Sequence, residues 1–320
     1  MPTSCAVPAP RSFTTGKASE ADVAADEVER WEQHNAESLV PLSCRVPAGV
    51  AFRAVQVNLQ LERLHLALVR GTAHAVVRDE PLVKALPTDS IAVYAALCGD
   101  ALVEHGGKRR VIRPGQLLVC DVDRPFLRGF GHGLEELAVK VPRRDFTALT
   151  GLTTVEHPIV VDARPGADPY GRALVRLVGR AVRASSAVPA DEQAILELVS
   201  VVATGGGVSL GIAHRAAARS YIDDHLSDPT LSAADVAAAA GVSERHLSRL
   251  FSDAGTSVPR HILARRLDLA YSMLRQGSPA SERTADVAER CGFTSASYFS
   301  TAFRRRFGRT AGEVLRGAAG

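Results

Sequence analysis

One short pattern occurs twice in the last third of the chain, and it restricts the fold more than any other feature of the sequence. Residues 231–255 read LSAADVAAAAGVSERHLSRLFSDAG, and residues 284–308 read TADVAERCGFTSASYFSTAFRRRFG. In each copy a run of small apolar residues leads to a glycine, a short polar turn and a second apolar-spaced run. Glycine favours the left-handed backbone that ends a helix, and the Ser or Thr after it favours the start of the next. Each copy is therefore predicted to be a helix-turn-helix unit.

The helix ends within the two copies carry recognisable signals. Ser232 is followed three residues later by Asp235, which is the spacing of a capping box at a helix start. Ser243 in the first copy and Thr294 in the second are expected to cap the second helix. When the two glycines are aligned, the apolar spacing of the second helices agrees better after a shift of one residue, so two registers stay open.

The second helix of the second copy combines three kinds of surface. Phe299, Phe303 and Phe307 recur at four-residue intervals and are expected to face inward. Small polar side chains lie between them, and arginines from Arg304 to Arg306 end the helix, where phosphate contacts are natural. Such a helix suits the groove of a duplex, because small side chains allow close approach.

A single helix of about 18 residues, from Pro259 to Gln276, is predicted to join the two units. Proline is favourable in its first turn, because the missing N–H has no helical partner there. The helix would span about 27 Å. With the width of the flanking units added, this length suits two DNA-reading helices about 34 Å apart, which is one turn of B-DNA. One helix-turn-helix pattern often reflects simple helix packing, whereas two copies on one spacer favour nucleic-acid binding.

The charge distribution agrees with an anionic partner for this part of the chain. Residues 210–320 contain 15 Arg, no Lys and 11 Asp or Glu, which leaves 23 basic and 24 acidic residues in 1–209. The positive excess of the whole chain, +3, therefore lies in the last third. A solvated helix face would show a similar excess, so charge alone does not decide the function.

The preceding residues are predicted to form a β-rich domain and a helical connector. Residues 1–18 are rich in Pro, Ser, Thr and Ala and are expected to be disordered, and 19–37 have the pattern of a capped amphipathic helix. Residues 39–142 contain short apolar segments between turn residues, which predicts an antiparallel sandwich or small barrel. Two helical segments follow at 170–187 and 190–204, and they either complete one domain core or pair with a second copy.

The segments LSAADVAAAAGVSERHLSRLFSDAGTSVPRHILARRLDLAYSML and TADVAERCGFTSASYFSTAFRRRFGRTAGEVLR together resemble the DNA-binding domain of AraC/XylS-type transcriptional regulators. The resemblance covers about 110 residues and is most specific in VAERCGF and SYFSTAFRRRFG. RGTAHAVVR and RPGQLLVCDVDRPF are similar, more loosely, to the cupin-like arm of one branch of that family. The chain departs from the family pattern at three positions. Val258 and Ala311 stand where the family commonly has proline, and Val314 stands where it commonly has an aromatic residue.

The resemblance implies an α+β chain with an N-terminal cupin-like β-barrel, a helical connector and a C-terminal all-α domain with two helix-turn-helix units. The implied domains are a tail and helix at 1–38, a sensor barrel at 39–142, a connector for dimerisation at 143–209 and a DNA-binding domain at 210–320. The implied function is sequence-specific binding of double-stranded promoter DNA, usually with activation of transcription, under control of a small-molecule effector. RNA polymerase and a second copy of the chain are the other expected partners, and no cofactor is expected.

Carried over position by position, the resemblance also assigns roles in the two reader helices. The first reader is expected to face bases with Arg245, Ser248 and Arg249. The second is expected to face bases with four small residues, Ala296, Ser297, Ser300 and Thr301. Phosphate contacts are expected from Ser295, Arg304 and Arg305. Because arginine can bind guanine through two hydrogen bonds, the first reader is expected to dominate the sequence preference.

An enzyme is the rival class, and the sequence gives it little support. Cupin-like barrels often hold a metal through two closely spaced histidines, whereas His65, His74, His105 and His132 are scattered. The five cysteines have no metal-ligand spacing, and no phosphate-binding loop or nucleophile elbow is visible, so no catalytic or metal site is predicted. A module that binds only other proteins is a third class, from which a DNA binder differs by losing affinity steeply as salt rises.

The sequence also predicts the compartment. The N-terminal residues lack a basic region followed by an apolar stretch, and no apolar run reaches the roughly 18 residues that a membrane span needs. An odd number of scattered cysteines is typical of a reducing environment. A cytoplasmic protein without membrane contact is therefore expected.

Overall fold

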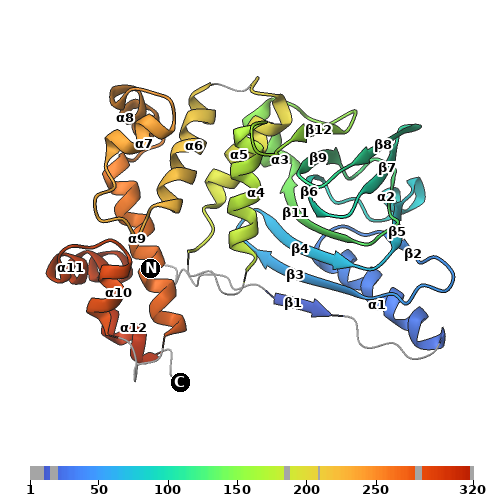
Figure 1. Ribbon diagram of the computed structural model, residues 1–320, viewed down its shortest axis with the longest axis horizontal. Coiled ribbons are helices and arrows are strands. Elements are labelled where there is room, and N and C mark those ends of the chain that lie inside the picture. Colours follow the sequence, from blue (N-terminus) through green and yellow to red (C-terminus); the bar gives the residue numbers. More distant parts are fainter. Residues whose placement is uncertain (1–10, 15–20, 184–187, 208–209, 278–282, 318–320) are drawn as a thin grey trace. The chain divides into compact units, whose positions relative to one another are not determined.

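The chain of 320 residues forms two compact units in the computed structural model (Figure 1). The structure describes residues 11–14, 21–183, 188–207, 210–277 and 283–317. Of these, 11–183 and 195–207 make up the β-rich unit, and 188–194 and 210–317 make up the helical unit. The chain therefore leaves the β-rich unit, returns to it and leaves it again.

The N-terminal segment differs from the prediction of disorder over residues 1–18. Arg11–Thr14 form strand β1, and the rest of that segment lies outside the described residues. β1 pairs antiparallel with residues 55–58 of the neighbouring strand. A sheet edge offers unpaired main-chain groups to any extended segment, so this pairing needs no apolar pattern in the sequence.

Two antiparallel sheets form the β-rich unit. The larger contains, in spatial order, β1, β3 (Ala54–Gln60), β4 (His65–Gly71), β11 (Leu134–Pro142), β6 (Ser90–Cys98), β9 (Gln116–Asp121) and β12 (Ile159–Asp162). The smaller contains β2 (Ser43–Arg45), β5 (His74–Arg78), β10 (Phe126–Phe130), β7 (Ala101–His105) and β8 (Lys108–Ile112). The α+β class is confirmed, but the ladders of the described strands do not close into the predicted barrel, and the result is a cupin-like sandwich.

The core of the β-rich unit lies between the two sheets. Residues alternate in β7 and β10, where one face is buried and the other is more exposed, as expected for strands with one covered face. Val69 and Tyr94 from the larger sheet share a buried cluster with Val103 and Phe126 from the smaller. Helix α1 (Ala21–Ser38) adds Trp31 to that cluster.

Helices cover the outer face of the larger sheet, which explains why β6 is buried on both sides. α3 (Arg143–Thr150) contacts β6 and β11, and α4 (Pro169–Ala181) contacts β4 and β11. The apolar side chains that recur along one side of the first connector segment form a stripe, and all of them are buried here: Leu174, Leu177, Val178 and Val182. That stripe is therefore used inside the unit. α2 (Glu80–Ala85) is a short helix of the same unit, and α5 (Glu192–Thr204) belongs to it from residue 195 on.

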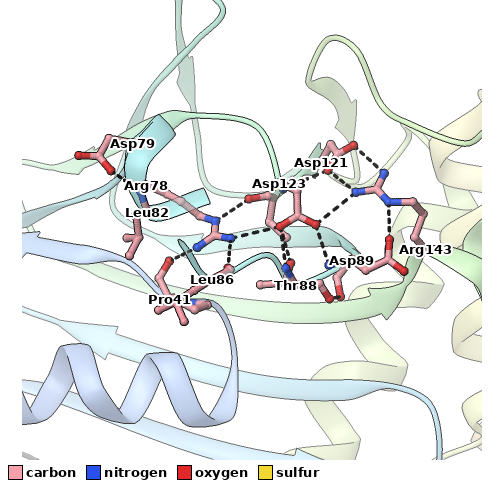
Figure 2. Close-up of polar contacts among 12 residues, drawn as sticks. Pro41, Arg78, Asp79, Leu82, Leu86, Thr88, Asp89, Asp121, Asp123 and Arg143 are labelled. Carbon is pink, nitrogen blue, oxygen red and sulfur yellow. Dashed lines mark hydrogen bonds and ion pairs between the residues drawn. The ribbon is translucent and has the colours of Figure 1, made fainter. Parts of the chain in front are cut away.

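A buried arginine holds together three loops at one end of the sandwich (Figure 2). The side chain of Arg78 has no exposed surface, and its Nε donates to Val122 O at 2.6 Å. Its two Nη atoms donate to Pro41 O at 2.8 Å and Leu86 O at 2.7 Å, and one also contacts Asp123 Oδ1 at 3.1 Å. Every polar edge of the guanidinium is thus used, which is the condition for burying such a group.

Two carboxylates next to Arg78 continue this network (Figure 2). Asp123 accepts from the main-chain N–H groups of Thr88 and Asp89, at 2.8 and 2.6 Å. Asp121 accepts from both Nη atoms of Arg143, at 2.7 and 2.8 Å. Burial by itself would raise the pKa of both carboxyl groups, but these donors outweigh it and hold each pKa below the ordinary value of 3.8.

The helical unit has seven helices among its described residues after 209, and a central one contacts most of the others. They are α6 (Leu210–Asp224), α7 (Ala233–Ala239), α8 (Glu244–Asp253), α9 (Val258–Gln276), α10 (Thr284–Arg290), α11 (Ala296–Phe307) and α12 (Ala311–Gly317). α9 contacts α8, α10, α11 and α12, and its buried apolar residues belong to one continuous core. The predicted joining helix is confirmed at 19 residues, with Ser257 as its N-cap.

One arginine of α9 is bonded to the segment before the first helix-turn-helix unit and lies against the second unit. The Arg266 Nε atom donates to Leu226 O at 3.0 Å, and Nη2 donates to Asp228 O in the loop before α7. Gly292, which follows α10, lies directly against this contact with φ of +76°. A Cβ at Gly292 would approach Leu226 O to 2.6 Å, so both the backbone angle and the space require glycine.

A buried ionic network joins the segment before α5 to α6 and α9. Asp191 caps α5 through Ala194 N at 3.0 Å and pairs with Arg219 at 3.1 Å. Arg265 donates to both carboxylate oxygens of Asp223, at 2.7 and 2.8 Å, and to Pro189 O at 2.6 Å. These contacts of Pro189 and Asp191 hold residues 188–191 within the helical unit. The buried charges can be accommodated there because each one faces an opposite charge.

Arg78→Ala is expected to destabilise the β-rich unit by about 3–5 kcal/mol, because it leaves a partly buried carboxylate and three carbonyls without their common donor. Urea denaturation followed by far-ultraviolet circular dichroism measures the change. Arg70→Ala is the control, since Arg70 forms an exposed pair with Glu135 that contributes about 0–1 kcal/mol. Equal effects of the two substitutions would contradict the buried role of Arg78.

Stability is expected to fall in acid through Asp121 and Asp123. Their folded-state pKa values lie below the unfolded value of about 3.9, so their contribution is complete above that pH and is lost as the pH falls through the folded values. Melting temperatures between pH 6 and pH 2.5 measure this loss. Asp121→Asn is expected to start lower at pH 6 and to lose less on acidification; a slope equal to that of the parent protein would refute the assignment.

Candidate nucleic-acid interface

Two helix-turn-helix units are present, formed by α7 with α8 and by α10 with α11. The predicted capping box at the start of α7 is confirmed, with Ser232 and Asp235 bonded to each other's main chain. α8 is capped by Ser243 as predicted, but α11 is capped by Ser295 and not by Thr294. The second turn is thus one residue longer than the first. Phe293 takes the place of Val242, since their N–H groups donate to the equivalent carbonyls of Ala288 and Ala237, and Thr294 is the additional residue.

The longer turn decides between the two registers that the sequence left open. Phe299 and Phe303 of α11 are buried, as Leu247 and Phe251 of α8 are. Tyr298 would take the place of Leu247 if the glycines were aligned, yet it is 56% exposed. The shifted register is therefore correct, and Phe307, predicted to face inward, is only partly buried at the end of the helix.

The first reader helix, α8, exposes the residues that were predicted to face bases. Arg245, Ser248 and Arg249 are all exposed, on the side opposite the buried Leu247 and Phe251. One Nη atom of Arg249 lies 3.2 Å from Nδ1 of His246. His246 packs edge-on against His214 of α6, at 5.9 Å between ring centroids. This contact orients the Arg249 guanidinium along the exposed face of the helix.

The second reader helix, α11, presents a face of small side chains. The predicted base-facing residues are all exposed: Ala296, Ser297, Ser300 and Thr301. The Ser300 hydroxyl donates to Ala296 O at 2.9 Å, so its proton is used within the helix. Ser295, predicted to contact phosphate, is exposed and accepts from Tyr298 N at 3.2 Å as the cap. The small side chains on this face allow the helix to approach a groove closely, and they contribute less through hydrogen bonds.

The three arginines at the end of α11 are not equivalent. Arg306 donates to both carboxylate oxygens of Asp268 on α9, each at 2.9 Å. Arg304 and Arg305 are exposed, and neither forms an ion pair within the part of the chain that the structure describes. The charges of Arg304 and Arg305 are therefore available to an anionic partner, whereas that of Arg306 is largely neutralised.

Tyr298 and the hollow beside it were not predicted as part of the site. A cavity of about 310 Å³ is bordered by the start of α7, the first half of α9 and the start of α11, with Arg266, Thr294 and Tyr298 among its walls. The one-residue mismatch between the repeats was the sequence signal that could have indicated the exposure of Tyr298, since only the shifted register places this residue outside the core.

Features of the other function classes were also sought among the described residues. In that part of the chain no three His, Cys, Asp or Glu side chains are arranged to hold a metal ion. Of the scattered histidines, His65 contacts the side-chain oxygens of Asn58 and Gln60, each at 2.9 Å, and His74 contacts Thr72 O at 2.7 Å. Across the same described ranges, no helix has the length and apolar character needed to cross a bilayer.

Comparison with known proteins agrees with this geometry. A model of the AraC-binding-like domain matches residues 31–204, and a model of the helix-turn-helix domain matches residues 236–317. The chain belongs to the AraC family of transcriptional regulators. The first match alone spans more than half of the chain, and the second begins inside the first helix of the first repeat.

Individual relatives extend over different parts of this AraC-family chain. The transcriptional activator NphR of a Rhodococcus species is 27% identical over 259 residues, which are 78% of this chain and 76% of NphR. The transcriptional activator RhrA of Rhizobium meliloti is 34% identical over 98 residues, or 31% of each chain. The crystal structure of the AraC-like transcriptional activator CuxR matches with a TM-score of 0.50 and 18% identity, and covers 82% of this chain and 96% of CuxR, which supports the fold.

Arg305→Ala is expected to reduce the salt dependence of DNA binding by about one unit in the slope of log K against log salt, because one phosphate contact is lost. Fluorescence anisotropy with a labelled duplex at several salt concentrations measures the slope. Arg306→Ala removes the same charge from the next position, but its partner is Asp268. We expect it to change the slope much less, and equal slopes for the two variants would contradict this distinction.

Proposed function

We propose that this AraC-family regulator activates transcription by placing α8 and α11 in successive major grooves of promoter DNA. The observation that carries the proposal is that both readers expose their polar face while one helix, α9, is built into the core beneath both. α9 has 19 residues, a length of about 28 Å, which suits the spacing of about 34 Å between successive turns of the groove. A fixed spacing of this kind lets one chain bind two adjacent grooves.

The two readers are proposed to differ in what they recognise. Arg245, Ser248 and Arg249 of α8 offer long donors and a hydroxyl, so this helix reads base edges and dominates the preference. The face of α11 has no long donor at its base-facing positions, so this helix recognises groove shape and anchors the complex. Ser295, Arg304 and Arg305 then contact phosphates and fix the register.

The other partners follow from the family and stay proposals for this chain. A small-molecule effector is proposed to bind the β-rich unit, which matches the AraC-binding-like domain. Activation through RNA polymerase is proposed because the relatives NphR and RhrA are named transcriptional activators. We propose a homodimer, a cytoplasmic location beside the DNA, and a regulatory role without catalysis, in keeping with the family to which the chain belongs.

Arg249→Ala is expected to weaken binding to the preferred site by about 1–3 kcal/mol and to relax the preference at one base position. Selection from a randomised duplex library, followed by titration of the enriched sequences, measures both effects. Arg304→Ala is the matched comparison, since it also removes one exposed arginine but is expected to weaken all sequences alike. Direct readout by Arg249 would be wrong if its replacement weakened every sequence equally.

A further inference from the structure

The hairpin of β7 and β8 carries a set of basic side chains on its inner face. Across the hairpin His105 lies opposite Lys108, and Val103 lies opposite Arg110. These four residues share their face with Ile112, which is buried in the core between the sheets. The inner face of the hairpin is thus apolar toward the core and basic toward the turn, at the edge of the sandwich.

His105 is the unusual member of this set. His105 is only 7% exposed, yet neither Nδ1 nor Nε2 of its ring has a hydrogen-bond partner among the described residues. Burying an unpaired polar group costs free energy, and the great majority of buried polar groups are satisfied. Two unpaired ring nitrogens in one buried imidazole therefore indicate that a ligand group completes the site.

The groups around His105 are mostly cationic. His157 borders the same small cavity as His105, Lys108 and Arg110, and Arg124 is close enough to act on the imidazole electrostatically. Burial, followed by the electrostatic effects of Arg124 and His157, holds the pKa of His105 below its ordinary value of 6.5. Asp121, an acid that acts on His105 electrostatically, is already bonded to Arg143 and Thr154. An anion at this place would meet an uncompensated positive field.

The size of the cavity limits what can enter it. The cavity bordered by His105 measures about 10 Å³, which is close to the space that one water-sized group occupies. Val103, Leu118 and Pro158 form its apolar walls, whereas Lys108 and Arg110 are exposed at its rim. A single oxygen can therefore reach the imidazole, and the rest of a ligand must lie outside, between the two cationic side chains.

We propose that this site binds the carboxylate or phosphate group of a small molecule. One oxygen accepts a hydrogen bond from the His105 ring, and the remaining oxygens accept from Lys108 and Arg110 at the rim, as is usual for oxyanions. If the ligand is the effector, the effector is an anion, and that step rests on the proposed regulatory function. The binding site itself does not depend on that function.

The test is titration of the full chain with inorganic phosphate and with acetate, against sodium chloride at matched ionic strength. Isothermal calorimetry and melting temperature are the readouts, and the anion that binds distinguishes a phosphate from a carboxylate ligand. We expect saturable binding of at least one of the two, with a rise in melting temperature that chloride does not give. No saturable binding of either anion would overturn the proposal.

Substitutions locate the site on the hairpin. Arg110→Ala is expected to weaken anion binding at least tenfold, and Arg109→Ala is the matched control, since Arg109 is the next residue and pairs with Glu104 on the outer face. Equal losses in the two variants would overturn the proposal. His105→Phe is expected to keep or raise the melting temperature without anion, because it removes two unpaired nitrogens, and to abolish the rise with anion.

DNA binding by the same proteins separates this proposal from the proposed function. The parent, Arg109→Ala and Arg110→Ala proteins are expected to bind a selected duplex equally in the absence of anion, because the hairpin belongs to the β-rich unit. Saturable anion binding without any DNA binding would refute the regulatory function and leave the site intact. DNA binding without anion binding would refute the site alone.

Discussion

The packing of α9 against both helix-turn-helix units is the constraint on which the rest of the helical unit depends. Two readers can occupy adjacent grooves only if their separation is fixed, and flexible linkage would forfeit most of the advantage of joining them. Here the spacing is set by buried apolar contacts along α9 and by Arg266, whose guanidinium binds the carbonyls of Leu226 and Asp228. Gly292 lets the second unit approach that guanidinium closely, so one small residue helps to set the distance between the readers.

Charge is used in opposite ways in the two units. In the β-rich unit, Arg78, Arg128 and Arg143 are bonded to carboxylates or carbonyls inside the protein, where they hold loops and strands in place. On the readers, four exposed arginines have no such carboxylate partner among the described residues: Arg245, Arg249, Arg304 and Arg305. An arginine whose guanidinium is already bonded to a carboxylate of the protein is not available to a phosphate. Arg306, which is bonded to Asp268, is an example. The number of arginines on a reader helix therefore overstates the number of its phosphate contacts.

The residues that the sequence analysis assigned to DNA contact lie on exposed surface, whereas several local details of the reader helices differ from the expectation. All ten residues that the resemblance assigned to DNA contact are exposed on or next to the two reader helices. Their exposure agrees with the apolar spacing, which fixes the buried face of each helix. The cap of α11, the exposure of Tyr298 and the neutralised Arg306 were missed, because each depends on a neighbour that is distant in the sequence or on a turn longer by one residue. Their roles in DNA binding are separate predictions that the exposure does not test.

The sequence by itself determined the repeat, its two helix-turn-helix units and the caps Ser232 and Ser243, because these depend on local spacing and backbone preference. It also carried the resemblance to a regulator family, which the family models bear out. Only the tertiary structure decided that the strands form two open sheets, that the stripe on α4 is covered within the unit, and that His105 is buried without a partner. Those outcomes depend on which surfaces meet, and residues far apart in the chain, such as Asp121 and Arg143, meet only when the whole fold is formed.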